Sequence, residues 1–225
     1  MTVGSAIRNG VRSVEEWWFD MTRGVQTAGN APVPPATGIV GELRDGNMYG
    51  PVRAANAHRA LRDLPIQDYS EYTFIDIGSG KGRMLFVAAE YPFRKVIGVE
   101  FSTDLHAQAE ANLARYKFRG KKCGEIVPIH ADAAEFVFPE EKLVVFMFNP
   151  FGPDIMGRML ANLERSIERC PRHVVVLMLW PENWELVAGM KSMQEVRRNR
   201  RYHVYQAGLG QADAVMTDTA RSALP

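Results

Sequence analysis

From residue 73 onward, short apolar runs alternate with longer segments in which apolar residues recur every three or four positions. Continuous apolar runs are typical of strands buried on both faces of a sheet, and the longer period is typical of helices. The runs lie at 73–77, 95–100, 125–130, 143–148 and 173–180. The segments at 82–91, 103–116 and 153–170 predict helices between them. Strands that alternate with helices predict a mainly parallel sheet covered on both sides.

Residues 182–191 predict a short final helix, and residues 193–198 and 202–207 predict two more strands, joined by a hairpin around Asn199. The strands together predict an α/β fold: a Rossmann-like, doubly wound, mainly parallel seven-stranded sheet with helices on both faces. The expected sheet-bearing domain spans residues 49–207, and residues 208–225 read as a small, polar C-terminal tail.

Residues 1–48 do not continue the alternating pattern and predict a helical and irregular N-terminal extension. A helical apolar spacing covers residues 11–23 and includes Trp17 and Trp18, which we expect to pack against the core. The alternative is that the two indoles form a lid or an aromatic wall for a substrate. A second helical pattern, at residues 52–64, leads into the first strand.

Composition narrows the class of protein. The 225 residues carry a formal net charge of +1, so no long-range attraction to nucleic acid or to an anionic membrane is expected. No apolar run approaches the ~20 residues of a membrane helix, and no secretory signal is recognisable. We therefore expect a cytoplasmic protein with neither a nucleic acid nor a membrane as partner. The four arginines of residues 197–201 are expected at a solvated hairpin turn, with phosphate binding as the alternative.

The main chemical motif is the turn after the first strand. Gly78, Gly80 and Gly82 follow Asp76 at alternate positions, and glycines at such a strand-to-helix turn let a ligand approach the backbone. A P-loop is excluded because Lys81 is followed by glycine rather than serine or threonine. An acid beside the loop is a poor neighbour for a pyrophosphate and a good one for an ammonium group. The motif therefore favours a zwitterionic ligand.

Candidate ligand contacts follow the next three strands. Glu100 ends the second strand, where an acid can bind ribose hydroxyls, and Phe101 beside it can lie against adenine. Asp132 and Ala133 follow the third strand and can read the adenine amino edge. The fourth strand leads into the segment Asn149-Pro150-Phe151. Ligands bind at the carboxyl ends of strands in open α/β sheets, so these positions predict one site.

Over residues 49–180 the chain resembles the class I S-adenosylmethionine-dependent methyltransferases. The family motif D/E-x-G-x-G-x-G is met from Asp76 to Gly82, and Glu100 and Asp132 match its later acids. Asn149-Pro150-Phe151 is similar to the N-P-P-Y/F signature of amino-group methyltransferases, one position short. Tyr49-Gly50-Pro51 resembles the Tyr-x-Pro element of protein-lysine methyltransferases of this fold, and residues 19–29 are similar to uncharacterised bacterial relatives.

The resemblance implies an enzyme that uses S-adenosylmethionine (SAM) and no metal to methylate a nitrogen of an unidentified protein or small molecule. Asp76 would hold the methionine ammonium, backbone N–H groups around Gly78–Gly80 its carboxylate, and Glu100 the ribose. Asn149 and the carbonyl of Pro150 would accept hydrogen bonds from the acceptor nitrogen. The implied cofactor-binding residues are Tyr49, Asp76, Gly78, Ser79, Gly80, Glu100, Phe101, Asp132 and Ala133, and the implied catalytic residues are Asn149, Pro150 and Phe151.

Other interpretations remain open at this point. The protein could be an NAD(P)-dependent oxidoreductase or a non-catalytic SAM-binding module, and its oligomeric state is open. Asp132 could cap a turn, and Asn149-Pro150 could be an ordinary turn. Glu100 could be a neighbour of a helix N-cap, and Tyr49 could be a buried anchor for the N-terminal segment.

Overall fold

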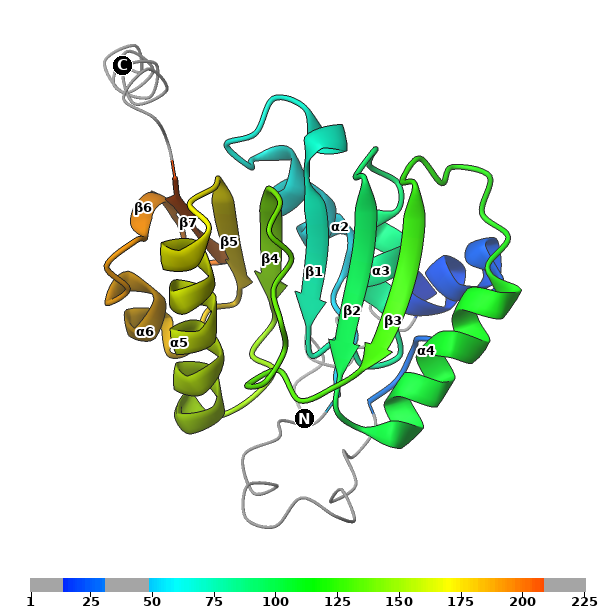
Figure 1. Ribbon diagram of the computed structural model, residues 1–225. Helices are drawn as coiled ribbons and strands as arrows, with labels where there is room; N and C mark the ends of the chain where they lie inside the picture. Colours follow the sequence, from blue (N-terminus) through cyan, green and yellow to red (C-terminus); the bar gives the residue numbers. More distant parts are fainter. Residues whose placement is uncertain (1–13, 31–48, 209–225) are drawn as a thin grey trace.

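All seven predicted strands join one sheet, with the order β3-β2-β1-β4-β5-β7-β6 (Figure 1). The computed structural model describes residues 14–30 and 49–208. Strands β1 to β5 pair in parallel, and β6 and β7 form an antiparallel hairpin, as the sequence pattern predicts. Strand β7 also pairs antiparallel with β5, a neighbour that the sequence pattern did not specify. The strands are β1 (Thr73–Ile77), β2 (Lys95–Glu100), β3 (Glu125–His130), β4 (Leu143–Met147), β5 (Val174–Leu179), β6 (Gln194–Arg198) and β7 (Tyr202–Ala207).

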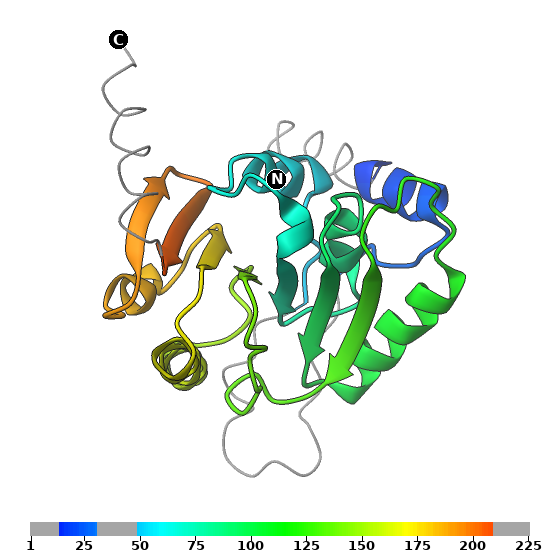
Figure 2. The same ribbon diagram turned by 45° about the horizontal axis from the view of Figure 1, so that its top comes forward.

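Helices cover both faces of this sheet (Figure 2). One face carries α2, α3 and a helix at residues 14–23, here called the N-terminal helix, while α5 and α6 cover the other. Helix α4 runs beside the edge strand β3 (Figure 1). The helices with printed bounds are α2 (Ala54–Arg62), α3 (Arg83–Ala88), α4 (Thr103–Arg115), α5 (Pro153–Arg169) and α6 (Trp184–Ala188), and a 3-10 turn, η2 (Tyr69–Glu71), precedes β1.

Helix α5 shows why the sequence pattern folds in this way. Pro153 occupies the first turn, where its missing N–H costs nothing, and the acidic Asp154 follows it at the positive end of the helix dipole. The buried residues recur every three or four positions and face the sheet. They are Met156, Met159, Leu160, Leu163, Ser166 and Ile167.

The strands divide their side chains between two apolar cores, one on each face. In β1, Phe74 joins the core under α2 and α3, whereas Ile75 and Ile77 join the core under α5. The same alternation continues in β4, where Val144 and Val145 point to opposite faces. A sheet that is buried on both sides explains why its strands read as continuous apolar runs.

The N-terminal helix corrects the expectation for the two tryptophans. The helix is present, but Trp17 is 61% exposed and Trp18 is 57% exposed, so neither packs in the core. Phe19, one residue further along, is buried in the core under α2 and α3. The helix therefore turns a different face toward the protein from the one its apolar spacing suggests.

The arginine run lies at the predicted hairpin. Asn199 Oδ1 accepts hydrogen bonds from the N–H groups of Arg201 and Tyr202, which closes the turn between β6 and β7. Arg198 pairs with Glu195 of the same strand, and Arg197 pairs with Asp63. The arginines of this run are exposed.

No helix within residues 14–30 and 49–208 has the length and apolar character needed to cross a membrane.

Candidate functional site

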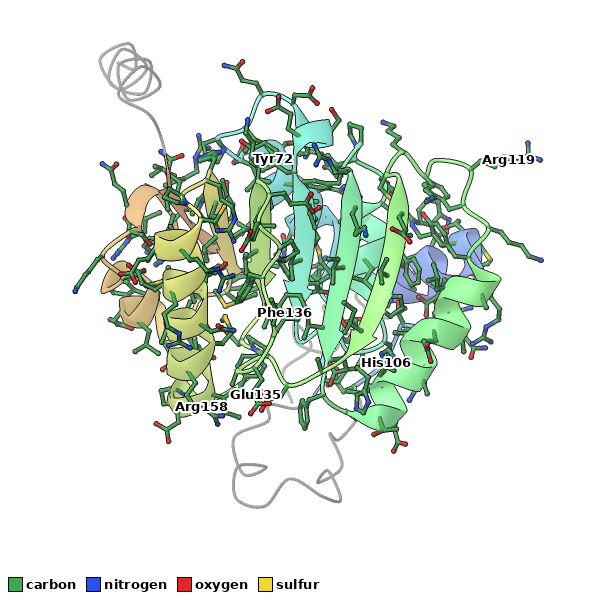
Figure 3. The ribbon with its side chains drawn as sticks, in the orientation of Figure 1. Tyr72, His106, Arg119, Glu135, Phe136 and Arg158 are labelled. Carbon is green, nitrogen blue, oxygen red and sulfur yellow. The ribbon has the colours of Figure 1, made fainter. Side chains whose placement is uncertain are left out.

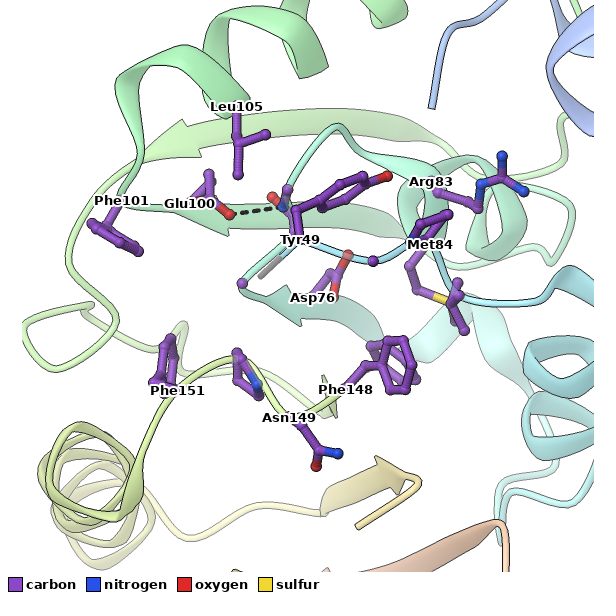
Figure 4. A pocket seen from close by; sticks show the side chains of 18 residues that line it. Tyr49, Asp76, Arg83, Met84, Glu100, Phe101, Leu105, Phe148, Asn149 and Phe151 are labelled. Atoms are coloured by element: carbon purple, nitrogen blue, oxygen red, sulfur yellow. Dashed lines mark hydrogen bonds between the residues drawn. The ribbon is translucent and has the colours of Figure 1, made fainter. Parts of the chain in front are cut away.

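The carboxyl ends of β1, β2 and β4 border one cleft (Figure 4). Every site residue predicted from the sequence lines this cleft, except Asp132 and Ala133. The cleft also takes in residues that the sequence analysis did not single out. These are Val52, Arg83, Met84, Leu105, Phe146 and Phe148, and Gly50 and Pro51 of the Tyr-x-Pro element line the cleft as well.

The glycine turn has the backbone that its sequence demands. Gly78 (φ 78°), Gly80 (φ 54°) and Gly82 (φ 87°) all lie in the left-handed region that disfavours other residues. Space matters as well, because a Cβ on Gly78 would lie 2.5 Å from Cβ of Pro150. A Cβ on Gly80 would lie 2.3 Å from the ring of Tyr49. Two predicted site residues thus pack directly on the turn, and only glycine permits both contacts.

Glu100 holds the glycine turn closed from the neighbouring strand. Its carboxylate, 4% exposed, accepts hydrogen bonds from the N–H groups of Gly80 (2.7 Å) and Ser102 (2.9 Å) (Figure 4). Burial raises the pKa of Glu100, and these backbone hydrogen bonds oppose that rise. The N–H groups of Gly78 and Ser79 both donate to the carbonyl of Val99. The amides expected to bind a cofactor carboxylate are therefore engaged within the protein.

Asp76 lies at the centre of the cleft without a hydrogen bond from any described residue. Asp76 lies one residue before the end of β1, lines the cleft and is 3% exposed. Burial raises the pKa of its carboxyl well above the usual range, and the nearby Glu100 raises this pKa further. A buried carboxylate with no partner is costly, and a cation placed beside it would offset that cost.

The third-strand residues lie outside the cleft lining. Asp132 Oδ1 accepts a hydrogen bond from the N–H of Ala134 at 2.8 Å, and its carbonyl accepts one from Glu135. Asp132 thus caps the turn that follows β3, and Ala133 is buried in the core under α5. Neither residue lines the cleft, although the N–H of Ala131, just before them in the chain, donates to the Glu100 carbonyl at 3.0 Å.

Asn149 braces two loops at the edge of the cleft. Its Nδ2 donates to the carbonyl of Trp180 at 2.7 Å, and its Oδ1 accepts from the N–H of Glu182 at 3.0 Å. The amide points away from Asp76 (Figure 4). Both Asn149 (φ 45°) and Trp180 (φ 50°) have left-handed backbone conformations. This conformation is strained for a bulky residue such as Trp180. Such local strain gathers at functional sites, and here the Asn149 amide stabilises it.

A buried hydrogen-bond network connects the N-terminal segment to residues that line the cleft, and the sequence motifs did not predict it. The Tyr49 hydroxyl donates to the carbonyl of Thr27 at 2.7 Å, and burial raises the pKa of that hydroxyl. Thr27 Oγ1 donates to Asp20 and accepts from Nε of Arg83 at 2.8 Å. Arg83 also donates to Asp20 Oδ1 at 3.2 Å, and its side chain is 2% exposed. Because the network is long-range, no local motif reveals it.

The two ends of the cleft differ in character (Figure 4). Phe101 and Leu105 stand beside Glu100 at one end and provide an apolar surface. Met84 and Phe148 line the other end beyond Asp76, and Phe146 also lines the cleft. Phe151 also lines the cleft, but it is 5% exposed and belongs to the core under α5. The acids therefore lie between two apolar regions.

Solved structures of other proteins share this architecture. No family model matches the sequence, and no curated protein matches it. Solved structures do match. One is described as a predicted N6-adenine-specific DNA methylase from Listeria monocytogenes, with 18% identity and a TM-score of 0.51. The match covers 70% of this chain and 51% of that chain, so this chain spans about half of that protein.

A second match is described as the complex between the Haloferax volcanii Trm112 methyltransferase activator and the putative methyltransferase. Its identity is 11%, its TM-score is 0.50, and the match covers 69% of this chain and 89% of that one. The ribosomal protein L11 methylase of Lactobacillus delbrueckii has 16% identity and a TM-score of 0.49, with 72% and 81% of the chains covered. The chain has the fold of the class I SAM-dependent methyltransferases, which confirms the predicted fold and family likeness.

Proposed function

We propose that this protein is a SAM-dependent methyltransferase that acts on a nitrogen of a protein or small-molecule acceptor. The fold supports this proposal, as does a cleft at the carboxyl ends of β1, β2 and β4. One observation carries it above the others: the buried Asp76 carboxylate faces the cleft with no hydrogen bond from a described residue. An α-ammonium group is the chemical partner that such a carboxylate lacks.

The same observation argues against a pyrophosphate cofactor. Asp76 and Glu100 both line the cleft, and a phosphate placed there would meet two buried acids. The opposing cation Arg83 is already bonded to Asp20 and Thr27 and points away from the cleft (Figure 4). A ligand with a cationic end therefore fits the electrostatics better than a dinucleotide does.

The remaining assignments follow from position in the cleft. The N–H groups of Gly80 and Ser102 occupy only some of the lone pairs of the Glu100 carboxylate. The remaining lone pairs would accept hydrogen bonds from ribose hydroxyls. Phe101 would lie against the adenine, together with Leu105. These placements put the methionine end at Asp76. The acceptor would then enter near Pro150 and Phe148.

The acceptor groups on this chain favour a weakly basic nitrogen. When bound, SAM supplies a methyl group already activated by a sulfonium, so the protein mainly has to align the acceptor and exclude water. The Pro150 carbonyl is the proposed hydrogen-bond acceptor for the target N–H. We propose Asn149 as a positioning residue, because its amide holds the loop at Trp180 and Glu182. A neutral carbonyl does not remove a proton from an ammonium, which a lysine acceptor of pKa about 10.4 would require at pH 7.

Ligand binding tests the proposal directly. Purified protein is titrated with S-adenosylhomocysteine, SAM and NADH, by calorimetry and by thermal unfolding. We expect both sulfur ligands to bind and to stabilise the fold, by about 2.7 kcal/mol at 100 times the dissociation constant. NADH should give no shift. Binding of NADH alone, or of no ligand by a folded sample, would sink the proposal.

Two carboxylate variants sharpen this experiment. Asp76→Asn removes the charge and should weaken S-adenosylhomocysteine binding by about 2–5 kcal/mol, which is thirtyfold or more. The control is Asp132→Asn, which changes a residue that does not line the cleft. It should change the affinity for S-adenosylhomocysteine less than threefold. A large loss in Asp132→Asn would instead assign that residue the adenine-reading role that the sequence predicts. Binding with no methyl transfer to any acceptor class would favour the non-catalytic module.

The raised pKa of Asp76 also predicts a pH dependence. Without ligand, the raised pKa means that the neutral carboxyl is favoured in the fold. Its contribution to stability is therefore present at low pH and is lost as the pH rises through the raised pKa. A bound ammonium favours the carboxylate, so affinity for S-adenosylhomocysteine should rise with pH by up to about tenfold per unit until Asp76 is ionised. Calorimetry across pH should show this slope, and a slope that persists in Asp76→Asn would contradict it.

A further inference from the structure

The N-terminal helix presents apolar side chains to solvent. Val14, Trp17, Trp18 and Met21 recur at a spacing of three and four, which places them on one side of the helix. Their exposed fractions are 65%, 61%, 57% and 54%. These four side chains, here called the outer face, include two of the chain's four tryptophans. Single exposed apolar residues need no explanation, but a contiguous apolar patch marks an interaction surface.

The opposite side of the same helix is polar and buried. Asp20 and Arg23 are 9% and 6% exposed, and Glu16 is 8% exposed. Arg23 Nε donates to Glu90 Oε1 at 3.0 Å, and Asp20 bonds to Thr27 and Arg83. These inward contacts fix the rotation of the helix about its axis. The outer face therefore cannot turn inward without breaking several buried charged contacts.

A basic segment contacts the C-terminal end of the N-terminal helix, which carries the outer face. The helix ends at Arg23, whose carbonyl accepts from the N–H of Lys117 at 3.1 Å, and whose guanidinium packs on the ring of Phe118. Five cations at residues 115–122 are exposed, and none of them forms an ion pair with a residue in the described ranges. Figure 3 shows one of them, Arg119, extending outward from this loop. The five are Arg115, Lys117, Arg119, Lys121 and Lys122, here called the basic loop.

Acidic groups on the contacting elements do not neutralise this surface. Glu15 on the helix pairs with Arg53, and Glu90 pairs with the buried Arg23. On α4, Glu110 lies one turn before the basic loop, at 3.7 Å from Nε2 of His106. The whole chain carries a net charge of only +1, so the excess of cations here is local.

We propose that the outer face and the basic loop together form a peripheral binding surface for anionic phospholipid bilayers. Apolar side chains with tryptophan, flanked by lysine and arginine, are the combination that holds an amphipathic helix at a bilayer surface. The cations meet anionic headgroups while the indoles enter the interface. The surface lies apart from the cleft, so this inference extends beyond the proposed function and revises the expectation of no membrane partner.

The size and shape of the outer face argue against a second copy as its occupant. Four side chains on a convex helix fall short of the roughly 20–30 residues a side of a stable protein interface. Attachment to a bilayer needs no such area, because lipids adapt to a convex surface and several basic residues add to the attraction.

Vesicle flotation tests the inference with the full chain. The probes are vesicles of phosphatidylcholine alone and of phosphatidylcholine with about 30 mol% phosphatidylglycerol, at low and high salt. We expect at least tenfold stronger binding to the anionic vesicles at low salt, a loss at high salt, and a blue shift of tryptophan emission. Trp17→Ser with Trp18→Ser should reduce this binding at least tenfold, and so should Arg119→Glu with Lys121→Glu.

Controls separate this surface from general stickiness and from misfolding. Val137→Ser removes a 76% exposed apolar side chain outside the outer face and should leave vesicle binding unchanged. Each variant must keep the circular dichroism spectrum and the unfolding midpoint of the parent. Equal binding to both kinds of vesicle, or no binding to either, would overturn the inference. A dimer that the tryptophan variant dissociates, seen by light scattering, would overturn it in favour of a second copy.

Discussion

The N-terminal helix and α5 carry the same kind of periodicity and bury opposite sides. In α5 the apolar stripe that includes Met159 and Leu163 faces the sheet, and polar residues face solvent. In the N-terminal helix the apolar stripe faces solvent, and the inward side is polar apart from Phe19. A hydrophobic period thus identifies a helix and its two faces. It does not say which face meets the protein.

The difference lies in what each helix packs against. Helix α5 packs on an apolar core that includes side chains of β1, β4 and β5, such as Val145 and Val176. The N-terminal helix meets Arg83 at the start of α3 and Glu90 beyond its end, which are charged and buried or nearly so. Charges buried there require charged partners, so the polar side of the helix turns inward. Burial of apolar surface stabilises the packing of α5, whereas pairing of buried charges stabilises that of the N-terminal helix.

The largest effect that separates the two regions should come from Asp20→Ala. This change removes an acceptor for Thr27 and Ala28 and leaves the buried Arg83 without its carboxylate. We expect the free energy of unfolding to fall by about 3–5 kcal/mol, as measured by urea denaturation. Asp20→Asn keeps an acceptor but loses the charge and should cost less. A loss below 1 kcal/mol for Asp20→Ala would show that the polar contacts do not hold this helix.

A second prediction concerns the apolar side of α5. Leu163 is fully buried, and Leu163→Ala should cost about 3 kcal/mol through lost burial and a residual cavity. Urea denaturation measures this change too. Because Leu163 is in the core under α5 and does not line the cleft, affinity for S-adenosylhomocysteine should stay within twofold. A selective loss of affinity at unchanged stability would contradict the separation of this core from the cleft.

The smallest effect should come from the apolar side of the N-terminal helix. Trp17→Ser removes a side chain that is 61% exposed, and we expect the free energy of unfolding to change by less than about 0.5 kcal/mol. A loss above 2 kcal/mol would mean that this indole packs against the protein, and the contrast with α5 would then fail.

The site shows the same division between what is local and what is not. The glycine turn, Asp76 and Glu100 were predictable because their backbone needs and their strand-end positions are written in consecutive residues. Asn149 was predicted as a group that faces the acceptor, yet its amide bonds to Trp180 and Glu182, more than 30 residues away in the chain. Local sequence placed Asn149 at the cleft without revealing the direction of its side chain.

The sequence by itself determined which segments along the chain form strands and helices, and it determined the glycine turn and the acids near the strand ends. These features depend on periodicity and on short-range backbone conformation. Only the tertiary structure decided which side of the N-terminal helix is buried, and it alone linked Tyr49 through Thr27 to Arg83. The physical reason is that burial of a charge depends on its partner. Here Arg83 meets Asp20 across 63 positions of the chain, a pairing that no local pattern encodes.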